Sequence, residues 1–175
     1  MDFATFFVKG YSHTNDPTTC ALLENTIKDL EWSREDYADW YWLPKQTKSL
    51  EDALLETHNL LAKKYVEQMS SNYSMGYRDL WNGIDKGAEH YHSDLNEGPN
   101  AMFLLYFNSM NENIGGGIGF RHSITKEESG LVYPQKYDII FGSQQSMWEH
   151  RASKMNIVPN DRIVATFGFY IEELQ

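Results

Sequence analysis

Three side chains in the C-terminal half of the chain could bind one metal ion. His92 and Asp94 are two residues apart, so on an extended backbone both side chains leave the same face and can converge on one ion. A third ligand would come from another strand, and His150 lies fifty-six positions beyond Asp94. Two imidazoles and one carboxylate occupy one face of an octahedral ion and leave three positions free for other ligands. Each residue is also compatible with a structural role, so the spacing alone gives a metal-site hypothesis.

The last predicted strand, residues 162–171, carries a second candidate feature. Its alternation places one wholly apolar face where helices can cover it, formed by Ile163, Ala165, Phe167 and Phe169. Arg162, Thr166 and Tyr170 share the opposite face. An arginine inside a small barrel is costly unless an anion meets it, and its planar guanidinium can hold a carboxylate through two parallel hydrogen bonds. The pattern indicates a dicarboxylate ligand, with a surface salt bridge near Asp161 as the alternative.

Helical segments followed by short strands must position these residues. Asp16-Pro17 opens a first helical segment that reaches Leu30, and residues 49–69 form a second one, in which Ser49 and Asp52 resemble a capping box. Seven short runs then read as strands: residues 73–81, 88–92, 101–108, 117–122, 136–142, 146–152 and 162–171. We therefore predict an α+β fold with a helical part at about residues 1–70 and a β core at about 73–171. The core would be a jelly roll or sandwich, with the helices packed on the outside of the sheet.

Composition favours one compact domain, residues 1–175, and narrows its partners. Apolar residues make up 41% of the chain, which is enough for a sizeable core. The formal net charge of -10 at pH 7 disfavours nucleic acid and anionic membranes as partners. One cysteine, Cys20, excludes an intrachain disulfide and a cysteine-based zinc site. No stretch has the pattern of a membrane span or a signal peptide, so we expect a cytoplasmic protein.

Between Tyr73 and Tyr170 the motifs resemble those of the 2-oxoglutarate/Fe(II)-dependent oxygenases, in particular the prolyl-4-hydroxylase-like members. His92-Ser93-Asp94 resembles the family's His-x-Asp motif. The other similar motifs follow in the family's order: Leu105-Tyr106-Phe107-Asn108, Gly115-Gly116-Gly117-Ile118-Gly119-Phe120, Asp138-Ile139-Ile140-Phe141 before His150-Arg151, and Arg162 with Thr166. The resemblance implies a double-stranded β-helix, which is the jelly roll of this family.

The resemblance also implies a role for each site residue. Fe(II) would be bound, and catalysis supported, by His92, Asp94 and His150. The cosubstrate 2-oxoglutarate would be bound by Arg162, Tyr106 and Thr166. Such an enzyme uses molecular oxygen to hydroxylate an unactivated C–H bond of a peptide, amino acid or small metabolite, and it releases succinate and CO2. Trp81 stands near the position where prolyl hydroxylases carry a tyrosine, so prolyl specificity does not follow from the resemblance.

Two other functions remain open at this point. His90-Tyr91-His92 with Glu97 resembles the His-x-His and Glu motif of cupins, which are also metal-binding jelly rolls, and His150 would complete that site. In that case His90 and Glu97 replace Asp94 as ligands. A non-catalytic jelly-roll module would instead stack its abundant tryptophan and tyrosine side chains on a carbohydrate or a peptide, and it would need no metal.

Overall fold

The computed structural model describes residues 1, 9–34, 41–83, 90–92, 98–143, 148–156 and 161–174. Two of the candidate metal ligands, Asp94 and Glu97, lie outside these ranges. Within the described ranges, no helix combines the length and the apolar character that a membrane crossing requires.

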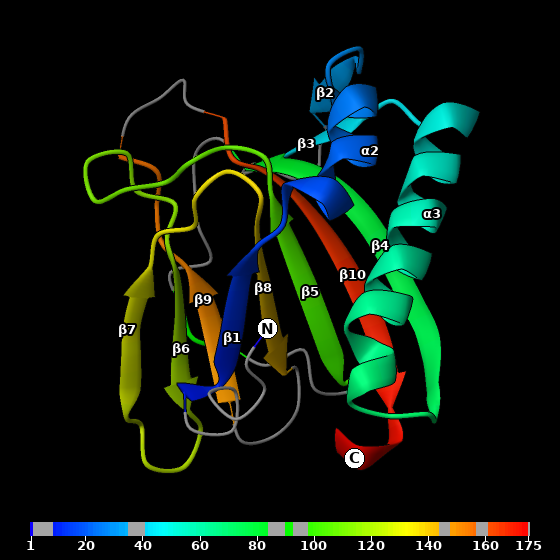
Figure 1. The fold of residues 1–175 in the computed structure, drawn as a ribbon. Coiled ribbons are helices and arrows are strands. Elements are labelled where there is room, and N and C mark those ends of the chain that lie inside the picture. Colours follow the sequence, from blue (N-terminus) through cyan, green and yellow to red (C-terminus); the bar gives the residue numbers. More distant parts are fainter. Residues whose placement is uncertain are drawn as a thin grey trace.

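Ten strands, two α-helices and two short 3-10 helices make up the described residues (Figure 1). In chain order they are β1 (Tyr11–Asn15), α2 (Pro17–Ile27), β2 (Trp32–Arg34), β3 (Tyr41–Pro44), α3 (Lys48–Lys64), η1 (Val66–Gln68), β4 (Tyr73–Gly83), β5 (Ala101–Tyr106), β6 (Ile118–His122), β7 (Glu128–Val132), β8 (Asp138–Ser143), β9 (Trp148–Ala152), β10 (Ile163–Ile171) and η2 (Glu172–Leu174).

The strands form one large and one small sheet. The large sheet has seven strands in the order β1-β8-β5-β10-β4-β3-β2, and the small sheet has three in the order β7-β6-β9. Neighbouring strands run antiparallel in both sheets. The last strand, β10, lies at the centre of the large sheet between β5 and β4. Residues just before β10 are therefore flanked by the ends of two other strands.

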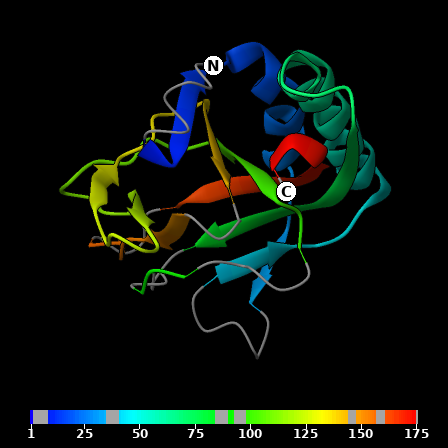
Figure 2. The ribbon, with the colours of Figure 1, turned by 90° about the horizontal axis from the view of Figure 1, so that it is seen from below.

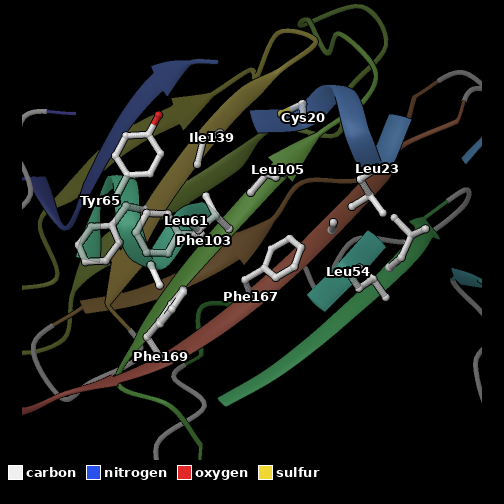
Figure 3. Packing of buried hydrophobic residues seen from close by; sticks show 14 of the residues in the cluster. Cys20, Leu23, Leu54, Leu61, Tyr65, Phe103, Leu105, Ile139, Phe167 and Phe169 are labelled. Atoms are coloured by element: carbon white, nitrogen blue, oxygen red, sulfur yellow. The ribbon is translucent and has the colours of Figure 1, made fainter. Parts of the chain in front are cut away.

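Alternation along the central strands divides the core into two layers. One face of the large sheet shares a cluster with the helices that includes Leu23, Leu61, Phe103, Phe167 and Phe169 (Figure 3). The other face shares a cluster with the small sheet that includes Met102, Leu104, Ile118, Phe120 and Val164. Figure 2 shows α2 and α3 lying over the first face. The prediction that the helices pack on the outside of the sheet is confirmed.

The N-cap of α2, Asp16, connects the two helices. Its carboxylate accepts a hydrogen bond from the Thr19 N–H at 3.2 Å and from Lys64 Nζ and the Tyr65 hydroxyl at 2.6 Å each. Burial alone would raise the pKa of Asp16, but these hydrogen bonds outweigh it and lower that pKa to about 2. The first helix thus begins at the predicted Asp16-Pro17 pair.

The second helix begins earlier than predicted. Its N-cap is Thr47, whose hydroxyl accepts a hydrogen bond from the Leu50 N–H at 3.2 Å. The capping box expected at Ser49 and Asp52 is therefore wrong, and Asp52 instead pairs with Lys48 at 2.9 Å. A threonine hydroxyl, like a serine hydroxyl, can accept a hydrogen bond from a first-turn N–H group. The sequence alone therefore does not decide whether Thr47 or Ser49 is the N-cap.

Four strands lie where the sequence indicated none. Strands β1, β2 and β3 fall in the part predicted as helical, and β7 falls between two predicted strands. Strand β1 has the polar sequence Tyr-Ser-His-Thr-Asn and exists through its pairing with β8 at the edge of the sheet. Local propensity does not show such a strand, because its partner is far away in the sequence. Of the predicted strand 88–92, residues 90–92 are described, and His92 forms a bridge with His150.

Candidate active site

A cavity of about 280 Å³ lies between the two sheets. Its polar lining comes from Asp79, His92, Tyr106, His150, Arg162 and Thr166. Its apolar lining comes from both sheets and includes Trp81, Met102, Leu104 and Ile118. Five of the six residues that the sequence analysis assigned to the site thus face one cavity, and the sixth, Asp94, lies outside the described residues.

Two histidines from segments far apart in the sequence meet at this cavity. The His92 N–H donates to the His150 carbonyl at 3.0 Å, and the His150 N–H donates to the His92 carbonyl at 2.9 Å. This antiparallel bridge brings their ring centroids to 4.5 Å, with the ring planes 57° apart. The structure therefore brings together the two imidazoles of the proposed metal site.

The local hydrogen bonds define which nitrogen of His92 can bind a metal. His92 Nδ1 lies 2.9 Å from the His90 carbonyl oxygen, which can only accept, so Nδ1 donates and leaves Nε2 as the candidate metal-binding nitrogen. A backbone carbonyl holding the far nitrogen is the usual support for a metal-ligating histidine. No group of three His, Cys, Asp or Glu side chains placed to hold a metal occurs within the described ranges. The third ligand, Asp94, stays a prediction from the sequence.

Arg162 is the most deeply buried charge of the cavity. Its residue is 4% exposed, and its guanidinium stacks on the Trp81 ring at 4.9 Å from the centroid. Nη1 donates to the Ser153 carbonyl at 3.5 Å, a long contact, and the buried Nε has no hydrogen-bond partner in the described part of the chain. Burial lowers the pKa of Arg162, because a guanidinium loses hydration there. The surface salt bridge considered as an alternative is wrong.

Two asparagines at the ends of neighbouring strands fix the backbone at Arg162. Asn82 Oδ1 accepts a hydrogen bond from the Arg162 N–H at 3.0 Å, and the Gly83 N–H donates to the Arg162 carbonyl at 3.1 Å. On the other side, Asn108 Oδ1 accepts from the Ile163 N–H at 2.7 Å. Asn108 ends the Leu105-Tyr106-Phe107-Asn108 motif, so this motif positions the strand that carries the arginine.

A glycine leaves room for the arginine's aliphatic stem. A Cβ on Gly116 would lie 3.1 Å from Arg162 Cδ and 2.6 Å from Met155 Sδ. Gly116 also has a φ of +73°, which a residue with a side chain adopts only with strain. Both the lack of space for a side chain and the positive φ therefore explain why a glycine occupies position 116, just before β6.

Tyr106 lies on β5, beside the strand that follows Arg162, and Thr166 lies on that strand itself, β10. Tyr106 is 3% exposed, and burial raises the pKa of its phenol to about 12, so the hydroxyl stays protonated and can donate a hydrogen bond. The Thr166 hydroxyl accepts a hydrogen bond from Trp81 Nε1 at 3.1 Å. Trp81 is thus held by Thr166 at its nitrogen and covered by Arg162 at its face. These contacts give the arginine end of the cavity one fixed arrangement.

One polar residue of the cavity was missed by the sequence analysis. Asp79 lies on β4, and its carboxylate accepts a hydrogen bond from the next N–H, that of Leu80, at 2.8 Å. Period-two alternation from Trp81 places Asp79 and Tyr77 on the same face, and all three line the cavity. The sequence therefore contained an indication of this residue, because Asp79 is two positions from Trp81 on one strand and shares its face.

Of the four ligands of the alternative cupin site, two lie at the cavity and one does not. His90 is exposed and contributes its carbonyl, not its ring, to the contact with His92. The residues that line the cavity include His92 and His150 and do not include His90. The other ligand of that hypothesis, Glu97, lies outside the described residues.

No protein-family model and no curated protein sequence matches the chain. Solved structures match its fold. HygX from Streptomyces hygroscopicus, with nickel and 2-oxoglutarate bound, has a TM-score of 0.68 at 8% identity, over 97% of this chain and 86% of that chain. A 2OG-Fe(II) oxygenase family oxidoreductase from Burkholderia pseudomallei has a TM-score of 0.71 at 13% identity, over 97% and 88%. A prolyl hydroxylase from Trichoplax adhaerens, in complex with a hypoxia inducible factor peptide fragment, has a TM-score of 0.63 at 12% identity, over 98% and 88%.

At these identities the similarity establishes the fold. The chain has the double-stranded β-helix fold of the 2-oxoglutarate/Fe(II) oxygenases, which confirms the predicted α+β jelly roll. The large and small sheets described above are the two layers of that jelly roll. Because one fold hosts many activities, the function has to be argued from the cavity and its residues.

Proposed function

We propose that this chain is a 2-oxoglutarate- and Fe(II)-dependent dioxygenase that hydroxylates an unactivated C–H bond. The observation that carries the proposal is the buried guanidinium of Arg162, which has no anionic partner among the described residues and lies in the same cavity as a histidine pair. A buried cation of this kind is costly unless a ligand supplies the anion. The shared fold of the 2-oxoglutarate oxygenases supports a diacid as that ligand.

The histidine pair fits a divalent transition metal. Neutral imidazole suits iron, and because Nδ1 of His92 donates to a carbonyl, Nε2 is the nitrogen of this ring that would bind the metal. We assign His150 as the second ligand and Asp94 as the third. Three protein ligands would leave half of an octahedral coordination sphere for the diacid and for oxygen.

The arginine end of the cavity fits the far carboxylate of 2-oxoglutarate. Arg162 would pair with that carboxylate, the protonated phenol of Tyr106 would donate a hydrogen bond to it, and Thr166 would complete the polar surface. Arg162 immediately precedes β10 and Thr166 lies within it, while Tyr106 lies on the neighbouring strand β5, where it pairs with Val164. A rigid sheet holds such a set in place without a change of shape on binding.

Iron and 2-oxoglutarate, when bound together, supply an oxidant made from molecular oxygen, with succinate and CO2 as products. The chain's own contribution is to hold the metal by one face, to orient the diacid, and to keep water out. Met102, Leu104 and Ile118 give the cavity apolar walls between these polar groups. An apolar lining that excludes water strengthens the pairing of Arg162 with a carboxylate and protects a reactive centre.

The substrate belongs to the peptides, amino acids or small metabolites. Proteins of similar fold support the peptide and small-metabolite classes, since one HygX structure holds hygromycin B and the Trichoplax prolyl hydroxylase holds a peptide fragment. The loops at the cavity rim differ between proteins of one fold and set such choices.

Anaerobic binding spectroscopy tests the proposal. Adding 2-oxoglutarate to the Fe(II)-loaded protein should produce a metal-to-ligand charge-transfer band, and subsequent exposure to oxygen should yield succinate. Asp94→Ala should abolish the band while His90→Ala retains it, and the reverse would favour the cupin arrangement. A protein that binds no metal and gains no stability from metal plus 2-oxoglutarate would instead be a binding module.

A further inference from the structure

Asp79 occupies a defined place on the inner face of the large sheet. In the register of β4 against β10, Trp81 pairs with Val164 and Asp79 pairs with Thr166. Asp79 therefore lies two residues farther from the Arg162 end of the cavity than Trp81 does, which is about 7 Å along β4 at the usual rise of a strand. It lines the same cavity as the histidine pair and lies directly across from Thr166, whereas Trp81 separates it from Arg162 along the sheet.

The carboxylate of Asp79 has an open bonding capacity. Its one hydrogen bond in the described part of the chain comes from the neighbouring Leu80 N–H, and it forms no ion pair there. Asp79 is exposed, and the partial loss of hydration beside the cavity raises the pKa of its carboxyl, an effect that the Leu80 N–H only partly offsets. A carboxylate facing a cavity in this state gains most from a cationic partner, which would restore a favourable environment for its charge.

Tyr77, two residues before Asp79, adds an aromatic surface on the same face of β4. It lines the cavity, is 42% exposed, and its hydroxyl lies 3.7 Å from Met102 Sδ. An aromatic face next to a carboxylate is a suitable environment for an organic cation, because both attract positive charge. Neither group favours an anion.

The two ends of the cavity therefore differ in sign. Arg162 would repel a cation and hold the diacid, whereas Asp79 would repel a second carboxylate. A molecule that occupies the Asp79 end beside a bound diacid is the substrate, so the charge of Asp79 bears on substrate choice rather than on cosubstrate binding.

We propose that Asp79, with the Tyr77 ring beside it, determines specificity for substrates that carry a protonated amine. The inference rests on the proposed dioxygenase function, since it assigns the substrate end of that same cavity. Asp79 would pair with the ammonium group and so fix which C–H bond of the substrate lies next to the metal.

A probe comparison on the loaded protein tests this assignment. The Zn(II)-loaded, 2-oxoglutarate-bound protein is titrated with hexylammonium, 1-hexanol and hexanoate, three chains of similar length and different charge, and binding is followed by NMR chemical shifts. Hexylammonium should bind about two- to fivefold more tightly than hexanol, as expected for an ion pair at an exposed carboxylate, and hexanoate should bind most weakly.

Asp79→Asn is the decisive variant, because the amide oxygen can still accept from the Leu80 N–H and so preserves the local structure. It should remove the preference for hexylammonium while leaving 2-oxoglutarate affinity unchanged. The matched control is Asp29→Asn, the same change of charge at an exposed residue after α2, and it should keep the preference.

The outcomes separate this inference from the proposed function. Loss of 2-oxoglutarate binding by the wild-type protein would overturn the proposed function itself. Retained 2-oxoglutarate binding without a preference for hexylammonium over hexanol would overturn the role of Asp79 alone. A preference that survives in Asp79→Asn would do the same.

Discussion

Replacing Arg162 with methionine should affect the stability of the free protein and its affinity for 2-oxoglutarate in opposite directions. Methionine keeps the length of the aliphatic stem and removes the charge. In the free protein the guanidinium is 4% exposed and has one long hydrogen bond, so it contributes little to stability there. The contact with the Trp81 ring, worth about 2 kcal/mol when desolvated, is the main favourable interaction that the variant loses.

Without ligand, the free energy of unfolding of Arg162→Met should not fall below that of the wild-type protein. Removing an incompletely paired buried charge saves a desolvation cost of several kcal/mol, and apolar replacements of buried ionic groups are often neutral or stabilising by about 1–4 kcal/mol. We therefore expect the free energy of unfolding of Arg162→Met to be unchanged or higher by ~1–3 kcal/mol. Urea denaturation of the metal-free protein measures it.

The ligand-bound protein should show the reverse. A charge-assisted hydrogen bond contributes roughly 1.5–3 kcal/mol, so losing the guanidinium should weaken 2-oxoglutarate binding by about 10- to 100-fold or more. Calorimetric titration of the Mn(II)-loaded protein tests this, with Arg78→Met on the neighbouring strand β4 as the control for an exposed arginine. Wild-type affinity in Arg162→Met, or a stability loss of the free variant above about 3 kcal/mol, would refute the reasoning, because Arg162 would then be a structural cation.

Three further outcomes are expected. Burial lowers the pKa of His58 from 6.5 to about 4, so the unfolded chain takes up a proton at a higher pH than the folded protein does. The contribution of His58 to the free energy of unfolding should be complete above pH 6.5 and fall by about 3 kcal/mol as the pH drops to 4. Urea denaturation at several pH values should show a weaker dependence of this free energy on pH for His58→Gln. Gly116→Ala should destabilise the protein by ~1–3 kcal/mol, because its φ is positive and the new Cβ would overlap the Met155 and Met110 sulfurs. The same Cβ would press on Arg162 Cδ and should weaken 2-oxoglutarate binding in calorimetry, so an unchanged affinity would contradict that contact. Tyr91 lies between the guanidinium groups of Arg121 and Arg151, at 4.3 and 4.8 Å, so Tyr91→Leu should loosen the segment carrying His92 and lower metal affinity, measured by chelator competition, more than it lowers stability.

The closing strand shows why much of the fold and site could be predicted. Its strict alternation separates Phe167 and Phe169 from Arg162 and Thr166, and the helices cover the first pair while the cavity receives the second. Burial on both faces makes the register unambiguous, because a shift of one residue would place an arginine against the helices. The same logic applies to Tyr106 on β5.

Other features depend on contacts that sequence patterns do not contain. The polar edge strand β1 is stabilised by β8, and the start of α3 was decided between two nearby hydroxyl residues, Thr47 and Ser49. Asp79 was missed because a carboxylate in a strand usually faces solvent, although its alternation with Trp81 could be read from the sequence. The support of Arg162 by Asn82 and Asn108 also requires knowing that β4 and β5 flank β10.

A crystal structure of the protein with Mn(II) and 2-oxoglutarate, grown without oxygen, tests the central claim most directly. We expect the ion on His92, Asp94 and His150, and the far carboxylate of the diacid on Arg162 and Tyr106. An ion bound at other side chains, or a diacid whose carboxylates both lie away from the guanidinium, would contradict it.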